Sequence, residues 1–296
     1  MIDLTKLVTE TRNPNTMDLD QMTPLELVSV MNQEDLNVVA GVKEVLPQVA
    51  QAIEWAVSSL EAGGRIVYFG AGTSGRLGVL DAVECPPTFG VSPDVVVGLI
   101  AGGEKAFVRA VEGAEDSLEL CEEEFKKIGL NKNDIAIGIA ASGRTPYVIG
   151  GLRYARSLGC KTVAIACNKG SEVGKEAKLA IEPSCGPEVL TGSTRLKSGT
   201  AQKMILNMIS TGSMVGVGKA YQNLMVDVQQ TNKKLVVRAQ NITMAATGCT
   251  REEAAQALEQ ADGNAKLAIV MLLTQMPVEE AKAKLEAAHG HVRGAL

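Results

Sequence analysis

The sequence has 296 residues, of which 46% are hydrophobic and 21% are charged. This length suits about two domains, and the apolar content excludes a disordered chain. The 29 basic and 34 acidic residues give a net charge of −5, which argues against a nucleic-acid-binding surface. The sequence has neither an apolar run of about 18 residues, as a membrane span needs, nor an apolar leader. We therefore expect a cytoplasmic protein without a membrane or nucleic-acid partner.

The six cysteines and two histidines restrict the chemistry. The cysteines form no CxxC pair, so we expect reduced and mostly buried thiols. The histidines, His289 and His291, lie close to the C-terminus, in a tail that we expect to be frayed and exposed. We therefore expect no metal site, and we assign proton transfer in any enzymatic reaction to carboxylates.

Two helices are predicted in an N-terminal segment, residues 1–60, that packs on the core. Thr23-Pro24-Leu25-Glu26 is a capping box with proline at the first helical position, so a helix should run to about Met31. Apolar residues at helical spacing predict a longer helix over Asp35–Leu60, in which Pro47 is a candidate kink.

Short apolar runs then alternate with helix-like stretches. The expected strands are Arg65–Phe69, Asp94–Ile100, Asp134–Ala140, Lys161–Cys167 and Lys178–Glu182. The expected helices are Gly75–Ala82, Ala106–Val111, Asp116–Ile128, Pro146–Leu158 and Lys197–Lys219. This alternation predicts a doubly wound α/β domain over residues 61–222, with a parallel five-stranded sheet covered by helices on both faces.

After Tyr221 we expect no more strands, and residues 233–296 should form a small all-α domain. Thr250-Arg251-Glu252-Glu253 is a second capping box, and Pro277 opens the last helix. The expected helices are Lys233–Ala246, Arg251–Gln260, Asn264–Thr274 and Val278–Ala288.

The loop after the first expected strand, Gly70-Ala71-Gly72-Thr73-Ser74-Gly75, opens a helix and matches GxGxxG. A dinucleotide also needs a carboxylate at the end of the next strand, and that strand ends in Gly98-Leu99-Ile100-Ala101-Gly102. We therefore disfavour a nicotinamide cofactor. Free backbone N–H groups at a helix start, together with the hydroxyls of Thr73 and Ser74, suit a phosphate monoester.

A second loop, Ser142-Gly143-Arg144-Thr145, follows the third strand and also precedes a helix. Because ligands bind beyond the carboxyl ends of parallel strands, both loops are placed to surround one phosphate. The alternative is that they are only tight turns with helix caps. A third turn, Gly186–Lys197, carries Ser193 and Thr194, which either cap the following helix or contact the same ligand.

Gly-Thr-Ser in the first loop and Ser-Gly-x-Thr in the second resemble the sugar isomerase (SIS) domain of phosphosugar enzymes. More narrowly, the chain resembles the family of N-acetylmuramic acid 6-phosphate etherases in segments between Thr9 and Lys203, among them Asp81–Phe89 and Glu112–Asp116. The helical tail resembles the ubiquitin-associated-like module of that family. The resemblance implies a flavodoxin- or Rossmann-like SIS fold, no cofactor, and a homodimer that shares its active site. It assigns phosphate binding to Gly72, Thr73, Ser74, Gly75, Ser142, Gly143, Thr145, Ser193 and Thr194.

The resemblance also implies a reaction. The family removes the D-lactyl ether of N-acetylmuramic acid 6-phosphate by elimination and water addition, giving N-acetylglucosamine 6-phosphate and D-lactate in cell-wall amino-sugar catabolism. The carried-over catalytic residues are Glu84, as proton donor, and Glu115, as base. Because two prolines follow Glu84, we expect it at the last turn of its helix or just beyond.

Other assignments stay open at this point. Glu112, Asp116 and Glu188 compete with the two glutamates, and Lys197 is a candidate for opening the sugar ring or for holding the substrate carboxylate. The alternative functions are a phosphosugar isomerase and a non-enzymatic sugar-phosphate sensor on the same scaffold. A sensor needs neither glutamate, and an isomerase needs no acid directed at a lactyl oxygen.

Overall fold

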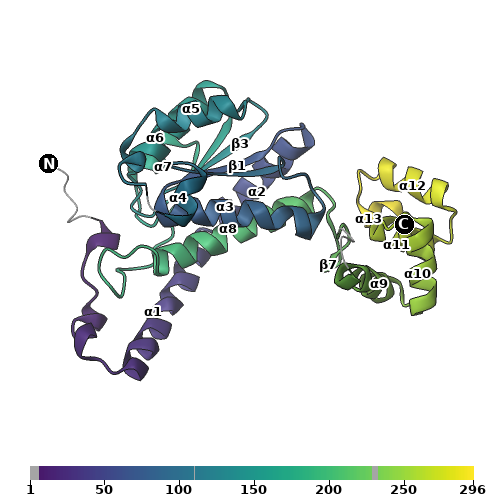
Figure 1. Ribbon diagram of the computed structural model, residues 1–296, viewed down its shortest axis with the longest axis horizontal. Coiled ribbons are helices and arrows are strands. Elements are labelled where there is room, and N and C mark those ends of the chain that lie inside the picture. The colour runs from purple at the N-terminus through teal and green to yellow at the C-terminus, as the bar shows by residue number, and fades with distance from the viewer. Residues whose placement is uncertain (1–6, 110, 229–232) are drawn as a thin grey trace. The chain divides into compact units, whose positions relative to one another are not determined.

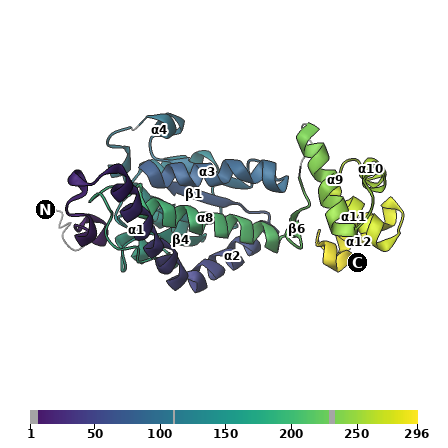
Figure 2. The same ribbon diagram turned by 90° about the horizontal axis from the view of Figure 1, so that it is seen from below.

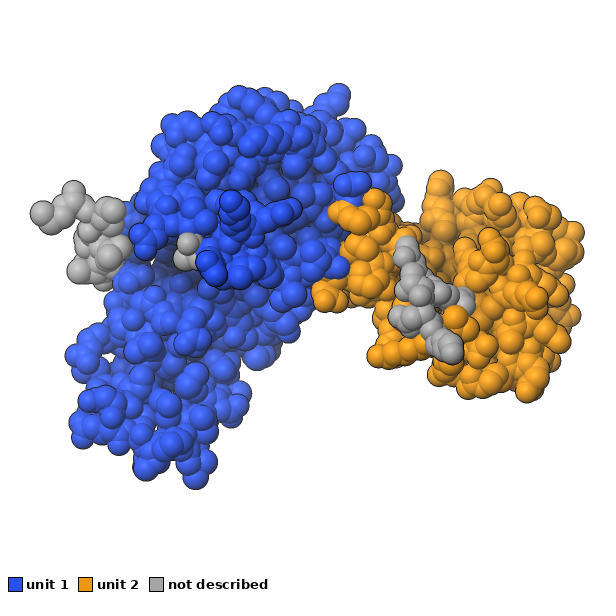
Figure 3. Space-filling view, in the orientation of Figure 1, with its two compact units in different colours: residues 1–83, 94–210 blue, residues 84–93, 211–296 orange. Residues whose placement is uncertain are grey.

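The computed structural model describes residues 7–109, 111–228 and 233–296. The chain divides into two compact units, which Figure 3 distinguishes by colour. The first unit comprises Met1–Val83 and Asp94–Ser210, and the second comprises Glu84–Pro93 and Thr211–Leu296. The helices α3 (Gly72–Phe89) and α8 (Lys197–Gly216) each contribute residues to both units.

The first unit is built on a five-stranded sheet in the order β2-β1-β3-β4-β5, in which every pairing is parallel. The strands are β1 (Ile66–Gly70), β2 (Val96–Ile100), β3 (Ile135–Ile139), β4 (Lys161–Ile165) and β5 (Leu179–Ile181). All residues of β1 and β3 are buried, as expected for central strands of a sheet covered on both faces. The predicted doubly wound parallel sheet is confirmed.

Helices lie on both faces of this sheet (Figures 1 and 2). On one face, Phe69 of β1 packs with its ring centroid 5.0 Å from that of Phe125 and 6.4 Å from that of Tyr147. On the other face, α3 lies so close to β1 that a Cβ on Gly78 would be 3.0 Å from Cβ of Tyr68. Phe125 lies in α5 (Leu120–Lys127), and Tyr147 lies in α6 (Pro146–Ser157). The helices α2 (Leu46–Glu61) and α7 (Glu172–Glu176) also contact the sheet.

The N-terminal helices divide at a different place from the predicted one. After three short 3-10 helices, α1 runs without a break over Pro24–Glu44, with the predicted capping box of Thr23 and Glu26 at its start. The expected break near Met31 is therefore wrong. The interruption falls at Val45, just ahead of Pro47, because proline lacks the N–H that would continue the α1 hydrogen bonds.

The helix α3 extends further than predicted. It includes Pro86 and Pro87 and ends at Phe89, so the expected stop at the double proline is wrong. Cys85 and Phe89, four residues apart on one face, are both buried, and this packing holds the last turn in helical form despite the missing N–H donors. Glu84 therefore lies inside the helix rather than at its end.

Two short elements of the first unit connect β2 to α5. They are α4 (Glu104–Val108) and the 3-10 helix η4 (Ala114–Asp116), which lie where the sequence predicted Ala106–Val111 and the start of Asp116–Ile128. The guanidinium of Arg76, in α3, holds the end of α4. Its Nε donates to the carbonyl of Phe107 and its Nη2 to that of Ala106, both at 2.8 Å.

In the second unit, a short antiparallel pair follows α8, formed by β6 (Ala220–Tyr221) and β7 (Leu224–Met225). The expectation that no strand follows Tyr221 is therefore wrong. The helices of this unit are α9 (Lys233–Thr247), α10 (Arg251–Gln260), α11 (Ala265–Thr274), α12 (Val278–Ala287) and α13 (Val292–Ala295). The C-terminal tail was expected to be frayed, and this expectation is wrong. The tail forms the helix α13, in which Val292 is buried.

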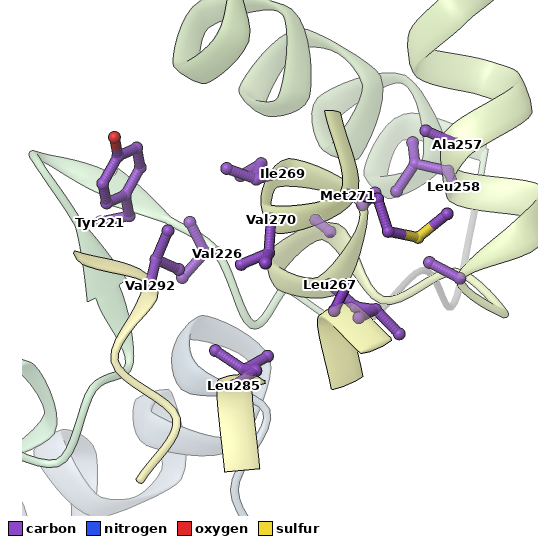
Figure 4. Close-up of a cluster of buried hydrophobic side chains, with 14 of the residues drawn as sticks. Tyr221, Val226, Ala257, Leu258, Leu267, Ile269, Val270, Met271, Leu285 and Val292 are labelled. Atoms are coloured by element: carbon purple, nitrogen blue, oxygen red, sulfur yellow. The ribbon is translucent and has the colours of Figure 1, made fainter. Parts of the chain in front are cut away.

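The core of the second unit forms around α11. This helix is apolar on nearly all sides, and its residues from Ala265 to Met271 are buried, as expected for a central helix. Figure 4 shows Val270 of α11 with Leu285 of α12 and Val292 of α13 in this cluster. Asp227 accepts ion pairs from Lys266 at 2.7 Å and Lys219 at 3.3 Å, which links the segment after β7 to α11.

Candidate functional site

The sheet reverses its direction of winding between β1 and β3, since the strand order is β2-β1-β3-β4-β5. Proteins wound in this way bind ligands outside the carboxyl ends of the strands at the reversal. Gly70 ends β1, Ile139 ends β3, and these two residues are register partners. The two predicted phosphate loops therefore leave the sheet from neighbouring positions.

The first loop turns sharply from β1 into α3. The helix begins at Gly72, so Thr73 and Ser74 lie in its first turn, where backbone N–H groups lack partners within the helix. A Cβ on Gly75 would lie 2.5 Å from the carbonyl oxygen of Gly70, so this approach of α3 to β1 requires glycine. Ser74 is buried, and its hydroxyl donates a hydrogen bond of 2.9 Å to Oε1 of Gln202.

The second loop turns from β3 into α6. Gly143 has a φ of +77°, and a Cβ there would lie 2.4 Å from Cβ of Ser171, so no other residue fits. Asn168 supports the loop, because its Nδ2 donates to the backbone oxygen of Ser142 at 3.1 Å. Thr145 is the N-cap of α6 but makes no side-chain cap hydrogen bond, so the helix-cap alternative is wrong for this hydroxyl.

The third turn leads into α8, whose first N–H groups are capped by a carboxylate. Glu188 is fully buried and accepts hydrogen bonds from the backbone nitrogens of Lys197 and Ser198, both at 2.9 Å. The alternative in which Ser193 or Thr194 caps this helix is therefore wrong. Glu188, a competitor for a catalytic role, stabilises the helix start instead.

Hydroxyl groups of the three loops remain available to a ligand. Within the described part of the chain, no hydrogen-bond partner is found for the side-chain hydroxyls of Thr73, Ser142, Thr145, Ser193 and Thr194. All of these side chains are half-buried. Partly buried hydroxyls without internal partners are suited to donate to an anion that arrives from solvent.

The first turn of α8 brings two of the loops together. A Cβ on Gly199 would lie 3.5 Å from Cγ2 of Thr73 and 3.6 Å from the backbone oxygen of Thr194, so both threonines pack against this glycine. The backbone oxygen of Ser198 also accepts a contact of 3.8 Å from Sγ of Cys167, just after β4. The loops after β1 and β4 and the turn before α8 thus meet at the start of one helix.

A polar pocket of about 560 Å³ opens beside the second loop. It includes Ser142 and Gly143, but not Thr73, Ser74, Thr145, Ser193 or Thr194. The pocket is lined by Leu7, Val8, Ser142, Gly143, Arg144, Cys167, Asn168, Lys169, Gly170, Ser171, Glu172, Lys175 and Ser184. The lining carries three basic residues, Arg144, Lys169 and Lys175, and one acidic residue, Glu172, so its net charge is positive and favours an anionic ligand.

The two candidate catalytic glutamates are carried by different units. Glu84 is an exposed residue of α3 in the second unit, and Glu115 is an exposed residue of η4 in the first. Gly113, with a φ of +76°, precedes η4 and turns the chain there. Both carboxylates are accessible to solvent.

A buried polar network behind the third turn was not predicted. Glu34 of α1 accepts hydrogen bonds from Nζ of Lys197 at 2.6 Å and from Nδ2 of Asn13 and Asn15, each at 2.8 Å. Burial by itself raises the pKa of Glu34, but the hydrogen bonds from Lys197, Asn15 and Asn13 lower it to about 2. Lys197 is only 1% exposed, so it holds α1 against α8 rather than extending toward a ligand.

Family models match the central part of the chain. The SIS domain model matches residues 124–211, and the model of the glucokinase regulatory protein N-terminal SIS domain matches residues 48–156. Among curated proteins, the N-acetylmuramic acid 6-phosphate etherase of Cronobacter sakazakii is 59% identical over 295 residues, covering 100% of this chain and 99% of that relative. The corresponding etherase of Pectobacterium atrosepticum is also 59% identical and is covered to 97%.

This chain belongs to the N-acetylmuramic acid 6-phosphate etherase family. Membership of this family accounts for the SIS fold, and a solved structure agrees with it. A protein from Bacteroides fragilis, assigned as a phosphosugar isomerase involved in capsule formation, superimposes with a TM-score of 0.50 at 19% identity, over 65% of this chain and 91% of that one.

Two further observations concern the etherase-family chain as a whole. None of its described helices is both long enough and apolar enough to cross a membrane. Within the described ranges, no three His, Cys, Asp or Glu side chains gather as metal ligands would.

Proposed function

We propose that this protein cleaves the D-lactyl ether of N-acetylmuramic acid 6-phosphate and releases N-acetylglucosamine 6-phosphate and D-lactate. The single observation that carries the proposal is the set of hydroxyls at the β1–β3 reversal for which the described residues supply no partner, in a chain that is 59% identical, over its full length, to named etherases. The reaction serves the catabolism of cell-wall amino sugars.

The phosphate of the substrate is anchored at the three loops. The N–H groups at the start of α3 and the hydroxyls of Thr73 and Ser74 supply donors from one side. Ser142 and Thr145 supply donors from the second loop, and Ser193 and Thr194 from the third turn. The anchor fixes the sugar by the end remote from the reacting carbons, so that the binding energy of the phosphate is available to orient those carbons.

The chemistry then needs a base and an acid. Opening of the sugar ring exposes an aldehyde, and the C–H bond beside it becomes acidic. A base removes that proton, the electron pair forms a carbon–carbon double bond, and the bond between the next carbon and the lactyl oxygen breaks. An acid protonates the departing oxygen, so that D-lactate leaves as an alcohol. Water then adds to the double bond and restores a saturated sugar.

Glu115 is the base in this scheme and Glu84 the acid. The division follows the family resemblance, and both side chains are accessible to a substrate from solvent. Lys197, the earlier candidate for ring opening, takes no part in the scheme because its ammonium is buried against Glu34.

We also propose that the protein acts as a homodimer that shares its active site. Its support is an apolar stripe on α1, which projects from the first unit (Figure 1). Leu25, Val28, Leu36 and Val39 are 74%, 56%, 58% and 58% exposed. They lie within about 80° of one another around the helix. An exposed apolar stripe of this kind is typical of a protein–protein contact.

A cytoplasmic location is part of the proposal. It is supported by the cysteines, all six of which are free thiols and five of which are buried. Free, buried thiols are typical of proteins that work in a reducing compartment.

The test is release of D-lactate by the purified protein from N-acetylmuramic acid 6-phosphate, measured with a coupled lactate dehydrogenase reaction. Unphosphorylated N-acetylmuramic acid is the matched control, and it should react far more slowly because the phosphate anchor is lost. Binding without lactate release would favour the sensor alternative. Isomerisation of a phosphosugar without lactate release would favour the isomerase alternative.

A further inference from the structure

A buried glutamine connects the first phosphate loop to α8. Gln202 has no exposed surface, and its Oε1 accepts the hydrogen bond that Ser74 donates at 2.9 Å. Its amide nitrogen, Nε2, is also buried and has no hydrogen-bond partner among the described residues. A buried polar group without a partner costs about 1–3 kcal/mol. The fold alone therefore does not account for an amide at this position.

The hydroxyl of Ser74 has one proton, and in this structure that proton points to Gln202. A phosphate oxygen can only accept hydrogen bonds, so Ser74 can bind phosphate with its hydroxyl only if the proton turns away from Gln202. Oγ of Ser74 would then face Oε1 of Gln202 with no hydrogen between them. Rotation of the amide by half a turn removes this conflict, because it brings the donor Nε2 to the place of Oε1.

We propose that Gln202 is a positioning residue for phosphate binding, an inference that rests on the proposed function. When the phosphorylated sugar binds, the amide of Gln202 turns over and Nε2 donates to Oγ of Ser74. The hydroxyl of Ser74 then donates to a phosphate oxygen. Gln202 itself does not touch the substrate and acts only through Ser74.

The surroundings of Gln202 support this role. Gly199 lies three residues earlier on α8 and thus on the same side of the helix, and a Cβ there would lie 3.5 Å from Cγ2 of Thr73. The side of α8 that carries Gln202 therefore faces the phosphate loop. Glutamine has both a donor and an acceptor at the end of its side chain, whereas glutamate at neutral pH has acceptors alone and methionine has neither.

The experiment measures binding and turnover together. N-acetylglucosamine 6-phosphate is titrated calorimetrically into the wild type, Ser74→Ala, Gln202→Met, Gln202→Glu and the double variant Ser74→Ala/Gln202→Met. The hydrogen bond from Ser74 to a charged phosphate is of a kind whose loss weakens binding about 10- to 100-fold. We expect Gln202→Glu to reach this range, because it keeps the Ser74 proton and adds a negative charge.

Two readouts separate positioning from general damage. The KM for N-acetylmuramic acid 6-phosphate should rise about 10-fold or more in Gln202→Glu, while kcat changes by less than about 3-fold, because the interaction acts on the phosphate anchor. The rise should be smaller in Gln202→Met, which loses the donor to Oγ of Ser74 but offers no acceptor for the Ser74 proton. The double variant should bind like Ser74→Ala alone, because Gln202 has no effect once the Ser74 hydroxyl is gone.

Asn207→Asp is the matched control for Gln202→Glu. Asn207 lies five residues further along α8, and its Nδ2 donates to Oδ1 of Asp81 on α3 at 2.7 Å. Asn207→Asp makes the same amide-to-carboxylate change and puts the new carboxylate next to that of Asp81, between the same two helices, α3 and α8. It should lower the stability of the protein without changing its affinity for phosphosugar.

The outcomes distinguish this inference from the proposed function. Suppose that the wild type releases lactate and that Ser74→Ala weakens phosphosugar binding. If the Gln202 variants then keep the wild-type affinity and KM, the inference about Gln202 is wrong and the proposed function is unaffected. Additive effects in the double variant would overturn the inference as well. A wild-type protein that binds no phosphosugar would overturn both.

Discussion

The ammonium group of Lys197 lies 2.6 Å from Oε2 of Glu34, and both side chains are almost fully buried. This ion pair connects α1 to the first residue of α8, the helix start at which the first phosphate loop and the third turn meet. Because Asn13 and Asn15 also donate to Glu34, the carboxylate has several partners and tolerates burial. The pair therefore holds the N-terminal segment against the binding site.

Replacing Lys197 by methionine should destabilise the first unit by about 3–5 kcal/mol, because it leaves the Glu34 carboxylate buried without its cation. Trp55, the one tryptophan in the sequence, lies in α2 and reports on this unit through its fluorescence during urea unfolding. The control is Lys169→Met, which removes the exposed ion pair of Lys169 with Glu44 at 3.1 Å. It should cost less than about 1 kcal/mol. Equal losses in the two variants would contradict the role given to Lys197.

The same network predicts a loss of stability in acid. The pKa of Glu34 is about 2, below its ordinary value of 4.5, so folding favours the ionised form. The stabilisation is complete above about pH 4.5 and disappears as the pH falls toward 2, for a total of about 3 kcal/mol. Urea midpoints measured between pH 2 and 6 should fall less steeply for Glu34→Gln than for the wild type. If the urea midpoints of the two proteins fall in parallel with pH, Glu34 does not contribute to the loss of stability in acid.

The two glutamates should be separable by their kinetics. Glu84→Gln and Glu115→Gln should each reduce lactate release by a factor of about 10² to 10⁴, without loss of folding, because both side chains are exposed. In deuterated water Glu84→Gln should still exchange the proton beside the aldehyde, whereas Glu115→Gln should not. Exposed Glu112→Gln is the control and should keep its activity. Full activity in Glu84→Gln would show that Glu84 is not the proton donor.

The apolar stripe of α1 should be needed for dimerisation. Leu36→Glu places a charge in the middle of the stripe, so light scattering should show a monomer where the wild type is a dimer. Leu190→Glu is a control of the same chemistry at another exposed leucine of the first unit, 52% accessible, and should not change the mass. A dimeric Leu36→Glu protein would place the interface elsewhere.

The sheet and its loops could be predicted because their signals are local. Each strand is a short apolar run, and each site loop is a Gly-rich turn directly after a strand, as in Gly70–Gly75. The helix boundaries depend on more distant packing and were less predictable. The apolar spacing continues through Val45, the residue that follows the end of α1, and the buried Cys85 and Phe89 keep α3 helical beyond two prolines.

The polar contacts behind the site could not be predicted, because nothing in a single sequence pairs residues so far apart. Lys197 and Glu34 are separated by 163 positions, and Gln202 and Ser74 by 128. Glu188 was misassigned for a related reason. It caps α8 from nine residues before the helix starts, outside the range in which capping motifs are recognised.

The fate of the ether oxygen tests the account most directly. The reaction should be run in water enriched in oxygen-18, and both products analysed by mass spectrometry. Elimination followed by water addition predicts a labelled oxygen in N-acetylglucosamine 6-phosphate at the carbon that carried the ether, and none in D-lactate. Label in D-lactate, with the original ether oxygen kept on the sugar, would contradict the mechanism proposed for Glu84 and Glu115.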